Sequence, residues 1–229
     1  MKRELLRTGD GSLTIRLPEW NEQYHSHHGA IAEALHVFIH MGLDHLRQQQ
    51  KTEPLAVLEV GFGTGLNTLM TWQHASDQGF SIDYRTLEAF PVERQEQELL
   101  NYPELLNADP KVYQRMHELP WGSKQELSPG FELEKIKIRL EDYQPLGDRH
   151  LIYFDAFGPR VQPELWTDEI FSKMFNDLLP AGVLVTYSAK GSVRRSMQSV
   201  GFEVERLPGP PGKREMLRAT KKLTEREKG

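Results

Sequence analysis

Glycines alternate with other residues in one turn of the chain, and this turn is the part of the sequence best suited to bind a ligand. Gly61, Gly63 and Gly65 follow an apolar segment at residues 55–60 and precede a segment with helical spacing that begins at Leu66. Glycine accepts a positive φ and allows a ligand to approach the backbone, while the first N–H groups of a helix are free to bind polar groups. The pattern predicts a strand, a ligand-binding turn and a helix; a turn with only a structural role is the alternative.

The spacing of the glycines distinguishes between two kinds of nucleotide ligand. A dinucleotide fingerprint requires a glycine or alanine three residues after its second glycine, and Leu66 occupies that position here. Glu59 stands just before the first glycine. A tight turn without the full pyrophosphate cradle fits the smaller methionine and ribose parts of S-adenosylmethionine. We therefore expect S-adenosylmethionine as the cofactor, bound at Glu59, Gly61, Gly63 and Gly65.

Two further acids follow predicted strands. Glu88 ends the segment at residues 82–87, and Asp142 follows the alternating segment at residues 136–140. Ligands of open α/β sheets bind along the carboxyl ends of the strands, where both acids are expected to lie. Glu88 is suited to accept hydrogen bonds from the ribose hydroxyls, and Asp142 to bind the adenine amino group, with Tyr143 available for packing. An ordinary surface position is the alternative for each acid taken alone.

Asp155 is the candidate catalytic residue. It follows the apolar segment at residues 151–154 and is followed by small and apolar residues. If the group to be methylated is an amine, it must be neutral and correctly oriented to attack the methyl carbon. An aspartate can accept a hydrogen bond from the N–H of the amine and so orient its lone pair. A sulfonium is already a good leaving group, so we expect no metal. The alternative role is a carboxylate that caps the following loop.

The rest of the pattern predicts how these residues are positioned. A β-hairpin is expected at residues 3–7 and 13–17, a loop and a helix within residues 20–50, and an irregular region at residues 101–130. Elsewhere strands alternate with helices, which predicts a mostly parallel sheet covered on both faces, a Rossmann-like α/β fold. The expected strands are 55–60, 82–87, 136–140, 151–154 and 183–187, the expected helices start at 66, 92, 167 and 192, and the segments 203–207 and 215–219 form a closing hairpin that adds an antiparallel edge strand.

Length and composition limit the organisation of the chain and its possible chemistry. The chain has 229 residues, of which 38% are hydrophobic and 27% charged, and it contains no cysteine. This composition supports a folded core and excludes disulfides, cysteine-ligated metals and cysteine nucleophiles. We expect an N-terminal extension at residues 1–50 that belongs to the same unit, a methyltransferase core at 51–222 and a charged tail at 223–229.

Neither a membrane segment nor a metal site is expected. No apolar run approaches the ~20 residues of a membrane span, and the charged start of the chain has no signal-peptide stretch, so the expected location is the cytoplasm. His27, His28 and His74 do not combine with other residues into a ligand set, and we interpret them as surface residues.

Charge is distributed unevenly along the chain. The chain from Lys190 onward contains eleven lysines and arginines and five acids, which gives a net charge of +6. Residues 1–189 carry a net charge of −11, so that the total for the chain is −5. A basic region on an acidic body can form a local phosphate-binding patch. A solvated surface with a charged tail is the alternative.

With these residues in place, the chain resembles the methyltransferases that finish 5-methylaminomethyl-2-thiouridine in the anticodon of tRNA. These are the methyltransferase half of the bifunctional MnmC proteins and their standalone MnmD counterparts. The glycine run 61–67 and the run 212–217 are specific in combination, because a generic methyltransferase would share only the glycines. The residues that carry the resemblance are Tyr24, His25, Ser26, Gly29, Glu33, Val37, Phe38, the run 61–67, Glu88, Phe90, Pro91, Asp155, Ala156, Phe157, Pro159, Trp166, Thr167, Val193, Arg194, Arg195, Gly201, Phe202 and the run 212–217.

The resemblance implies roles for further residues. It implies that S-adenosylmethionine also contacts Tyr24, Ser26, Glu33 and Asn67. Residues expected at the uridine or at tRNA phosphates are Phe157, Lys190, Arg194, Arg195, Lys213 and Arg214, with Tyr24 and Trp166 as further candidates for shaping the uridine pocket.

The expected activity is N-methylation of 5-aminomethyl-(2-thio)uridine at the wobble position of tRNA by a monomeric enzyme. The oxidase half of the bifunctional proteins would need its own dinucleotide-binding turn, which is absent here. Separate enzymes would therefore have to generate the aminomethyl substrate. Two alternatives remain: a methyltransferase of a small-molecule amine, and a non-catalytic RNA-binding Rossmann module.

Overall fold

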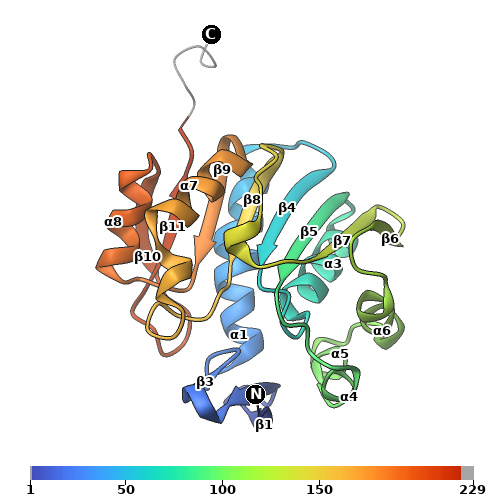
Figure 1. Cartoon of the computed structure of the whole chain (residues 1–229). Helices are drawn as coiled ribbons and strands as arrows, with labels where there is room; N and C mark the ends of the chain where they lie inside the picture. The colour runs from blue at the N-terminus through green and yellow to red at the C-terminus, as the bar shows by residue number, and fades with distance from the viewer. Residues whose placement is uncertain (1, 223–229) are drawn as a thin grey trace.

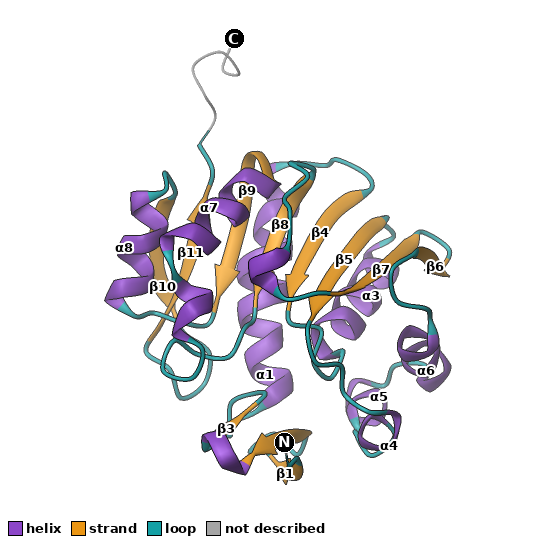
Figure 2. Cartoon of the chain, in the orientation of Figure 1, coloured by secondary structure: helices purple, strands orange, loops and turns teal. Residues whose placement is uncertain are grey.

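The computed structural model describes residues 2–222, and its centre is an eight-stranded sheet with helices on both faces (Figure 1, Figure 2). The strands lie in the order β10 (Glu203–Pro208), β11 (Glu215–Thr220), β9 (Leu178–Thr186), β8 (Arg149–Phe154), β4 (Leu55–Val60), β5 (Ile82–Glu88), β7 (Phe131–Lys137) and β6 (Lys124–Ser128). The five strands from β9 to β7 are parallel, whereas β11 and β6 pair antiparallel with their neighbours. The predicted mostly parallel α/β sheet with a closing antiparallel hairpin is confirmed.

The central strands are apolar because both of their faces are covered. In β4, Leu55 and Val57 belong to one buried cluster, and Leu58 and Val60 belong to another on the opposite face. A strand buried on both faces reads as a continuous apolar run. The covering helices are α1 (Ala30–Ala34), η2 (Leu35–Asp44), α2 (His45–Gln49) and α3 (Leu66–Gln78) on the first face, and α7 (Asp168–Asp177) and α8 (Gly191–Ser199) on the second.

A small antiparallel sheet precedes the core. It consists of β1 (Glu4–Arg7), β2 (Leu13–Leu17) and β3 (Glu22–Gln23), and it lies beyond the carboxyl ends of the central strands (Figure 1). The hairpin predicted from residues 3–7 and 13–17 is confirmed. The short third strand was not predicted, because its two residues, Glu22 and Gln23, carry no alternating apolar pattern.

The predicted helix within residues 20–50 is also confirmed, with a local distortion. Its central part, η2, is π-helical. Gly42 lies in this part and faces the sheet, where a Cβ would come within 3.0 Å of Val185 and 3.4 Å of Tyr153. The missing side chain therefore lets the helix lie close against β8 and β9.

The region at residues 101–130 was expected to be irregular, and this prediction is wrong. It contains α5 (Tyr102–Leu106), α6 (Pro110–Glu118) and β6, after a short helix α4 (Arg94–Gln97). Pro103 and Pro110 stand in the first turns of their helices, where a missing N–H removes no helical hydrogen bond. Asp109 also caps α6 by accepting the backbone N–H of Lys111.

Two other boundaries differ from the prediction. The strand expected at residues 136–140 is β7, which ends at Lys137 and is followed by the 3₁₀ turn η3 (Leu140–Asp142). The strand expected at 183–187 is β9, which begins five residues earlier, at Leu178, so the helix that begins after its confirmed cap Thr167 ends at Asp177. The charged tail expected at 223–229 lies outside the described residues. Within residues 2–222, no helix has the length and apolar character needed to cross a membrane.

Arg149 connects the amino ends of the central strands. Its side chain is 2% exposed, and its guanidinium donates to the carboxylate of Asp148 at 2.7 and 2.8 Å and to that of Asp83 at 3.3 Å. It also donates to the backbone carbonyls of Val57 and Asp83. One buried cation therefore satisfies acceptors from β4, β5 and the start of β8.

We expect Arg149→Ala to lower the free energy of unfolding by about 1–3 kcal/mol, because it removes the hydrogen bonds to Asp83, Asp148 and the Val57 carbonyl. Urea unfolding monitored by circular dichroism measures this loss. The matched control is Arg94→Ala, which removes an exposed guanidinium paired with Glu98 and should leave the unfolding midpoint nearly unchanged. Equal effects of the two substitutions would contradict the role given to Arg149.

Candidate active site

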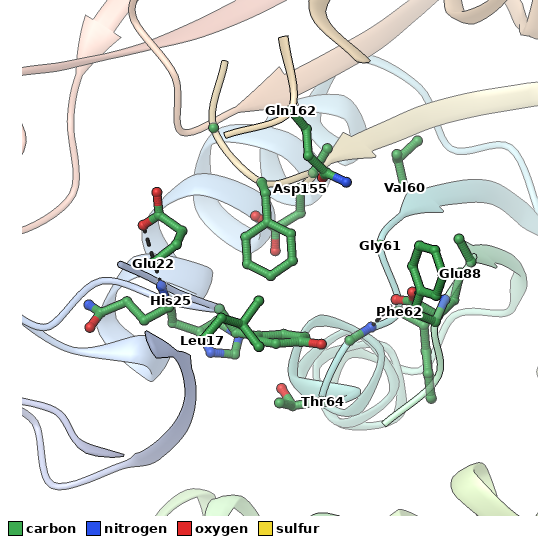
Figure 3. Close-up of a pocket in the computed structure, with 18 of the residues that line it drawn as sticks. Leu17, Glu22, His25, Val60, Gly61, Phe62, Thr64, Glu88, Asp155 and Gln162 are labelled. Carbon is green, nitrogen blue, oxygen red and sulfur yellow. Dashed lines mark hydrogen bonds between the residues drawn. The ribbon is translucent and has the colours of Figure 1, made fainter. Parts of the chain in front are cut away.

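A cavity of about 1100 Å³ opens at the carboxyl ends of β4, β5 and β8. Its walls come from three distant parts of the chain: the N-terminal sheet, the loops after the central strands, and the turn between β10 and β11. In Figure 3, Asp155 and Glu88 lie on the two sides of Gly61. The sheet edge that the sequence predicted as a ligand site therefore borders a large cavity.

The glycine turn allows the chain to pass close to the next strand. Gly61 has a φ of +94°, and a Cβ there would come within 2.9 Å of the Asp155 carbonyl oxygen. Gly63 has a φ of +50°, and a Cβ there would come within 3.0 Å of the Tyr24 ring. Both positions therefore favour glycine for their conformation and for the space available.

Glu88 is held against this turn. Its carboxylate accepts the backbone N–H of Gly63 at 3.0 Å and that of Phe90 at 2.8 Å, and the first of these bonds is dashed in Figure 3. The side chain is partly buried and lines the cavity. The structure thus brings together Glu88 and the glycine turn, which are separated by a helix in the sequence.

Asp155 lies at the other side of the turn. Its carboxylate accepts a hydrogen bond of 2.8 Å from the side-chain amide of Asn67, the second residue of α3. Burial, together with the charge of Glu33, raises the pKa of Asp155 from 3.8 to about 7. A carboxyl group with this pKa can both accept and release a proton near neutral pH.

The buried Glu33 and the partly buried Lys213 form an ion pair in the same cavity. The Glu33 carboxylate accepts the backbone N–H of Ser26 at 2.8 Å and lies 2.5 Å from Lys213 Nζ. Lys213 Nζ also lies 3.9 Å from the ring centroid of Tyr187. The Tyr187 hydroxyl donates to the carbonyl of Ala156, next to Asp155, at 2.8 Å. The pair is therefore linked to the loop that carries Asp155.

Aromatic side chains form one wall of the cavity. The rings of Trp20 and Tyr24 meet the edge or face of Phe157 at centroid distances of 5.7 and 5.0 Å. Arg160 connects the same two segments through a 2.9 Å ion pair with Glu22. The N-terminal sheet and the loop after β8 thus form a joint apolar surface beside Asp155. Trp166, a further candidate for the uridine pocket, is instead buried and donates to the Phe157 carbonyl.

Asp142 does not reach the cavity, contrary to the sequence prediction. It is exposed in η3, while Leu140 and Glu141 of the same turn line the cavity. Tyr143 is buried and donates to Asp177 at 2.8 Å, so it packs in the core. The physical reason is that β7 ends before the predicted strand does, and the 3₁₀ turn rotates Asp142 away.

Two other predicted cofactor residues lie behind the glycine turn. Gly65 caps α3 and faces α6, where a Cβ would come within 2.7 Å of Met116 and 3.0 Å of His117. Glu59 is fully buried, accepts a 3.0 Å hydrogen bond from Thr68, and does not line the cavity. Both residues can shape the turn from behind but do not border the space that a ligand would occupy.

The predicted basic residues separate into two groups. Lys213 lines the cavity, whereas the others lie outside its lining. Those outside are the exposed Lys190, Arg195 and Arg214 and the partly buried Arg194.

Several residues at the site were not predicted. Arg3 ties the N-terminal sheet to the loop after β5 through Glu96 at 2.8 Å and the Phe90 carbonyl at 3.0 Å. Trp20 and Tyr187 contribute rings to the cavity lining. No local pattern marks these residues, because their partners are distant in the sequence. Among residues 2–222, no group of three or more histidines, aspartates and glutamates could hold a metal ion.

The chain has clear relatives among known proteins. Residues 115–222 match the model of a family described as S-adenosyl-L-methionine-dependent methyltransferase. Over 221 residues the chain is 30% identical to the tRNA 5-methylaminomethyl-2-thiouridine biosynthesis bifunctional protein MnmC of Leptospira borgpetersenii, covering 90% of this chain and 33% of that protein. The MnmC protein of Cupriavidus necator is 31% identical over 218 residues, which cover 89% of this chain and 32% of the relative. The chain thus spans about one third of the length of these relatives.

A solved structure shares the fold. The crystal structure of MNMC2 from Aquifex aeolicus matches with a TM-score of 0.76 and 24% identity, covering 97% of this chain and 72% of that chain. This likeness confirms the predicted fold.

We expect Glu59→Gln to change how stability depends on pH. Burial raises the pKa of Glu59 from 4.5 to about 8, so the folded protein binds this proton more tightly than the unfolded chain does. Glu59 therefore lowers the free energy of unfolding as the pH rises between these two values, by up to about 1.4 kcal/mol per pH unit. In Glu59→Gln this contribution is absent, and its stability should fall less steeply over that range.

Urea unfolding of the wild type and of Glu59→Gln at intervals between about pH 5 and pH 8 measures the two slopes. Glu126→Gln, which changes an exposed residue of β6, is the matched control and should keep the wild-type slope. Identical slopes for the wild type and Glu59→Gln would show that the buried carboxyl does not titrate as described.

Proposed function

We propose that the chain is an S-adenosyl-L-methionine-dependent methyltransferase and that it methylates the amine of 5-aminomethyl-(2-thio)uridine at the wobble position of tRNA. One observation carries the proposal: a single cavity joins the glycine turn and Glu88 to a buried carboxyl, Asp155, whose pKa is raised to about 7. The names of the MnmC relatives support this choice of substrate.

The residues present fit S-adenosylmethionine as the cofactor. The cavity volume of about 1100 Å³ exceeds the range of about 300–1,000 Å³ typical of small-molecule sites, which leaves room for a substrate group beside the cofactor. Asn67 Oδ1 is buried without a partner in the described chain, so a polar ligand would satisfy it. The cofactor supplies a methyl group bound to a positively charged sulfur, which is a good leaving group.

We assign the cofactor-binding residues accordingly. Glu88 would accept hydrogen bonds from the ribose hydroxyls, and the turn would offer its backbone. The proposed contacts are Tyr24, Ser26, Glu33, Gly61, Gly63, Asn67 and Glu88, all of which line the cavity. Gly65 and Glu59 would support the turn from behind.

Asp155 would prepare the substrate amine. A free alkylamine has a pKa of about 10, so it arrives largely as an ammonium ion, which has no lone pair for attack. Asp155 would bind the ammonium, accept a proton or pass it to water, and hold a remaining N–H so that the lone pair faces the methyl carbon. The nitrogen then forms the new N–C bond while the C–S bond breaks and its electrons remain on sulfur. The methylated nitrogen afterwards loses a proton to solvent.

Two surfaces would bind the RNA. The aromatic wall of Trp20, Tyr24 and Phe157 would shape the pocket for the uridine, since aromatic side chains stack on unpaired bases. The residues proposed for phosphate contacts are Lys190, Arg194, Arg195 and Arg214, of which Arg194 and Arg195 lie on α8. The site described here performs methyl transfer only, so another activity must supply the aminomethyl group.

We expect Glu88→Ala to weaken binding of S-adenosylmethionine by about 1–3 kcal/mol, which corresponds to a loss of about 5- to 150-fold. The reason is the loss of a charged acceptor beside the glycine turn. Gly63→Val should abolish binding, because its side chain would meet Tyr24 and penalise the positive φ. Isothermal titration calorimetry measures both effects, with Glu126→Ala on β6 as the control. Wild-type affinity in a folded Gly63→Val protein would refute the cofactor site.

We expect Asp155→Asn to lower kcat/KM by about 10²–10⁴ while leaving cofactor affinity largely intact. Asparagine keeps the size of the side chain but cannot take the proton. The assay is methyl transfer to tRNA that carries 5-aminomethyl-2-thiouridine, with the nucleosides identified by mass spectrometry. The same tRNA without the aminomethyl group should give no product. Turnover by Asp155→Asn at the wild-type rate across the pH range would show that Asp155 only caps the following loop.

A further inference from the structure

Lys213 is held inside the cavity by the turn between β10 and β11. His36 on η2 hydrogen-bonds the Pro208 carbonyl at 2.8 Å, and the Lys213 N–H donates to the Pro210 carbonyl at 2.9 Å. Gly212 packs so tightly on the His28 imidazole that a Cβ would overlap the ring. This turn is therefore fastened to the segment that precedes α1.

The ammonium of Lys213 is occupied by groups within the cavity. Its Nζ lies 2.5 Å from the Glu33 carboxylate and 3.9 Å from the Tyr187 ring centroid. The Glu33 side chain is 9% exposed and that of Lys213 is 32% exposed, so the carboxylate is shielded from water and salt while the lysine is partly accessible. A phosphate contact by Lys213 would require breaking this pair. Its position instead places a permanent positive charge beside the loop that carries Asp155.

We propose that Lys213 is a positioning residue of methyl transfer, whose ammonium keeps the acceptor amine in its neutral, attacking form. The inference rests on the proposed function. A fixed positive charge disfavours a second positive charge nearby, and a neighbouring cation is a known means of lowering the proton affinity of an amine. Without Lys213, the carboxylates of Glu33 and Asp155 would both stabilise the unreactive ammonium form of the substrate.

The other ionisable groups around the site are acids, a phenol and histidines. Acids and a phenol face the site from four places, namely Glu22 on β3, Glu33 on α1, Glu88 at the end of β5 and Tyr187 after β9, while Glu59 on β4 acts on Asp155 from behind the glycine turn. His28 and His25 lie before α1, and burial lowers the pKa of His25 to about 4, so it is neutral at pH 7. Lys213 is the cation that lowers the pKa of Asp155 against burial and Glu33. Removing Lys213 therefore raises the pKa of Asp155 and that of the substrate amine.

The first test is the pH profile of kcat/KM for aminomethyl-tRNA between about pH 6 and pH 10. We expect Lys213→Met to shift the profile by about one pH unit to the alkaline side, which lowers the rate near pH 7 about tenfold and restores it near pH 10. Lys213→Arg should keep the wild-type profile. The double variant Glu33→Gln/Lys213→Met removes both charges of the pair and should move the profile back toward the wild type. Lys111→Met, on the exposed start of α6, is the charge-matched control.

The second test needs no turnover. An anticodon stem-loop carrying 5-aminomethyluridine is titrated into protein saturated with S-adenosylhomocysteine, in two buffers of different ionisation enthalpy. The difference in heat gives the number of protons released near pH 7, after subtraction of the value for an unmodified stem-loop. We expect the wild type to release clearly more protons than Lys213→Met, whose bound amine keeps its proton.

Different outcomes would refute the proposed function and the inference about Lys213. A wild-type protein that binds S-adenosylmethionine but does not methylate aminomethyl-tRNA refutes the proposed function. A wild-type protein that methylates it, with a Lys213→Met profile that is unshifted and proton release that is unchanged, overturns the inference about Lys213. A Lys213→Met variant whose only defect is a salt-dependent rise in KM for tRNA also overturns it, because that result describes a phosphate contact.

Discussion

The close approach of Gly61 to the backbone of Asp155 is the constraint on which the site depends. The Asp155 N–H donates to the Val60 carbonyl at 3.1 Å, and the Gly61 N–H donates to the Leu87 carbonyl at 2.9 Å. These bonds continue the hydrogen-bond ladder of the sheet past the ends of β5, β4 and β8. The loops that follow these three strands therefore begin at fixed positions relative to one another. Because Gly61 has no side chain, Glu88 and Asp155 can border one continuous space.

The rest of the cavity is assembled from segments far from this centre. Three ion pairs hold them in place: Arg3 with Glu96, Arg160 with Glu22, and Lys213 with Glu33. Each pair joins the N-terminal sheet or α1 to a loop at the carboxyl edge of the main sheet or to the closing hairpin. The Rossmann-like core alone would leave the carboxyl edge open to water, whereas the added segments provide the low-polarity surroundings that raise the pKa of Asp155.

The sequence was informative where a structural signal is local. Apolar strands, the glycine turn and acids at strand ends are all read within a few residues, and the sheet, the turn and the positions of Glu88 and Asp155 could be predicted from them. Asp142 was expected at the cavity because the strand was read to residue 140, whereas β7 ends at Lys137 and Asp142 is exposed in η3. Lys213 was assigned to RNA because its neighbours in sequence are basic, while its actual partner Glu33 is 180 residues away. Contacts between residues so far apart in the sequence produce no periodic pattern in a single sequence.

The pairing of Glu33 with Lys213 also has a consequence for how the protein matures. During translation, the glycine turn, α3 and Asp155 emerge and can fold well before residue 213 leaves the ribosome. The acceptor side of the cavity stays unfinished until the closing hairpin docks against α1, since Lys213 and Gly212 supply its last contacts. Nascent chains that hold most of the sheet but not yet the closing hairpin therefore lack a finished pocket.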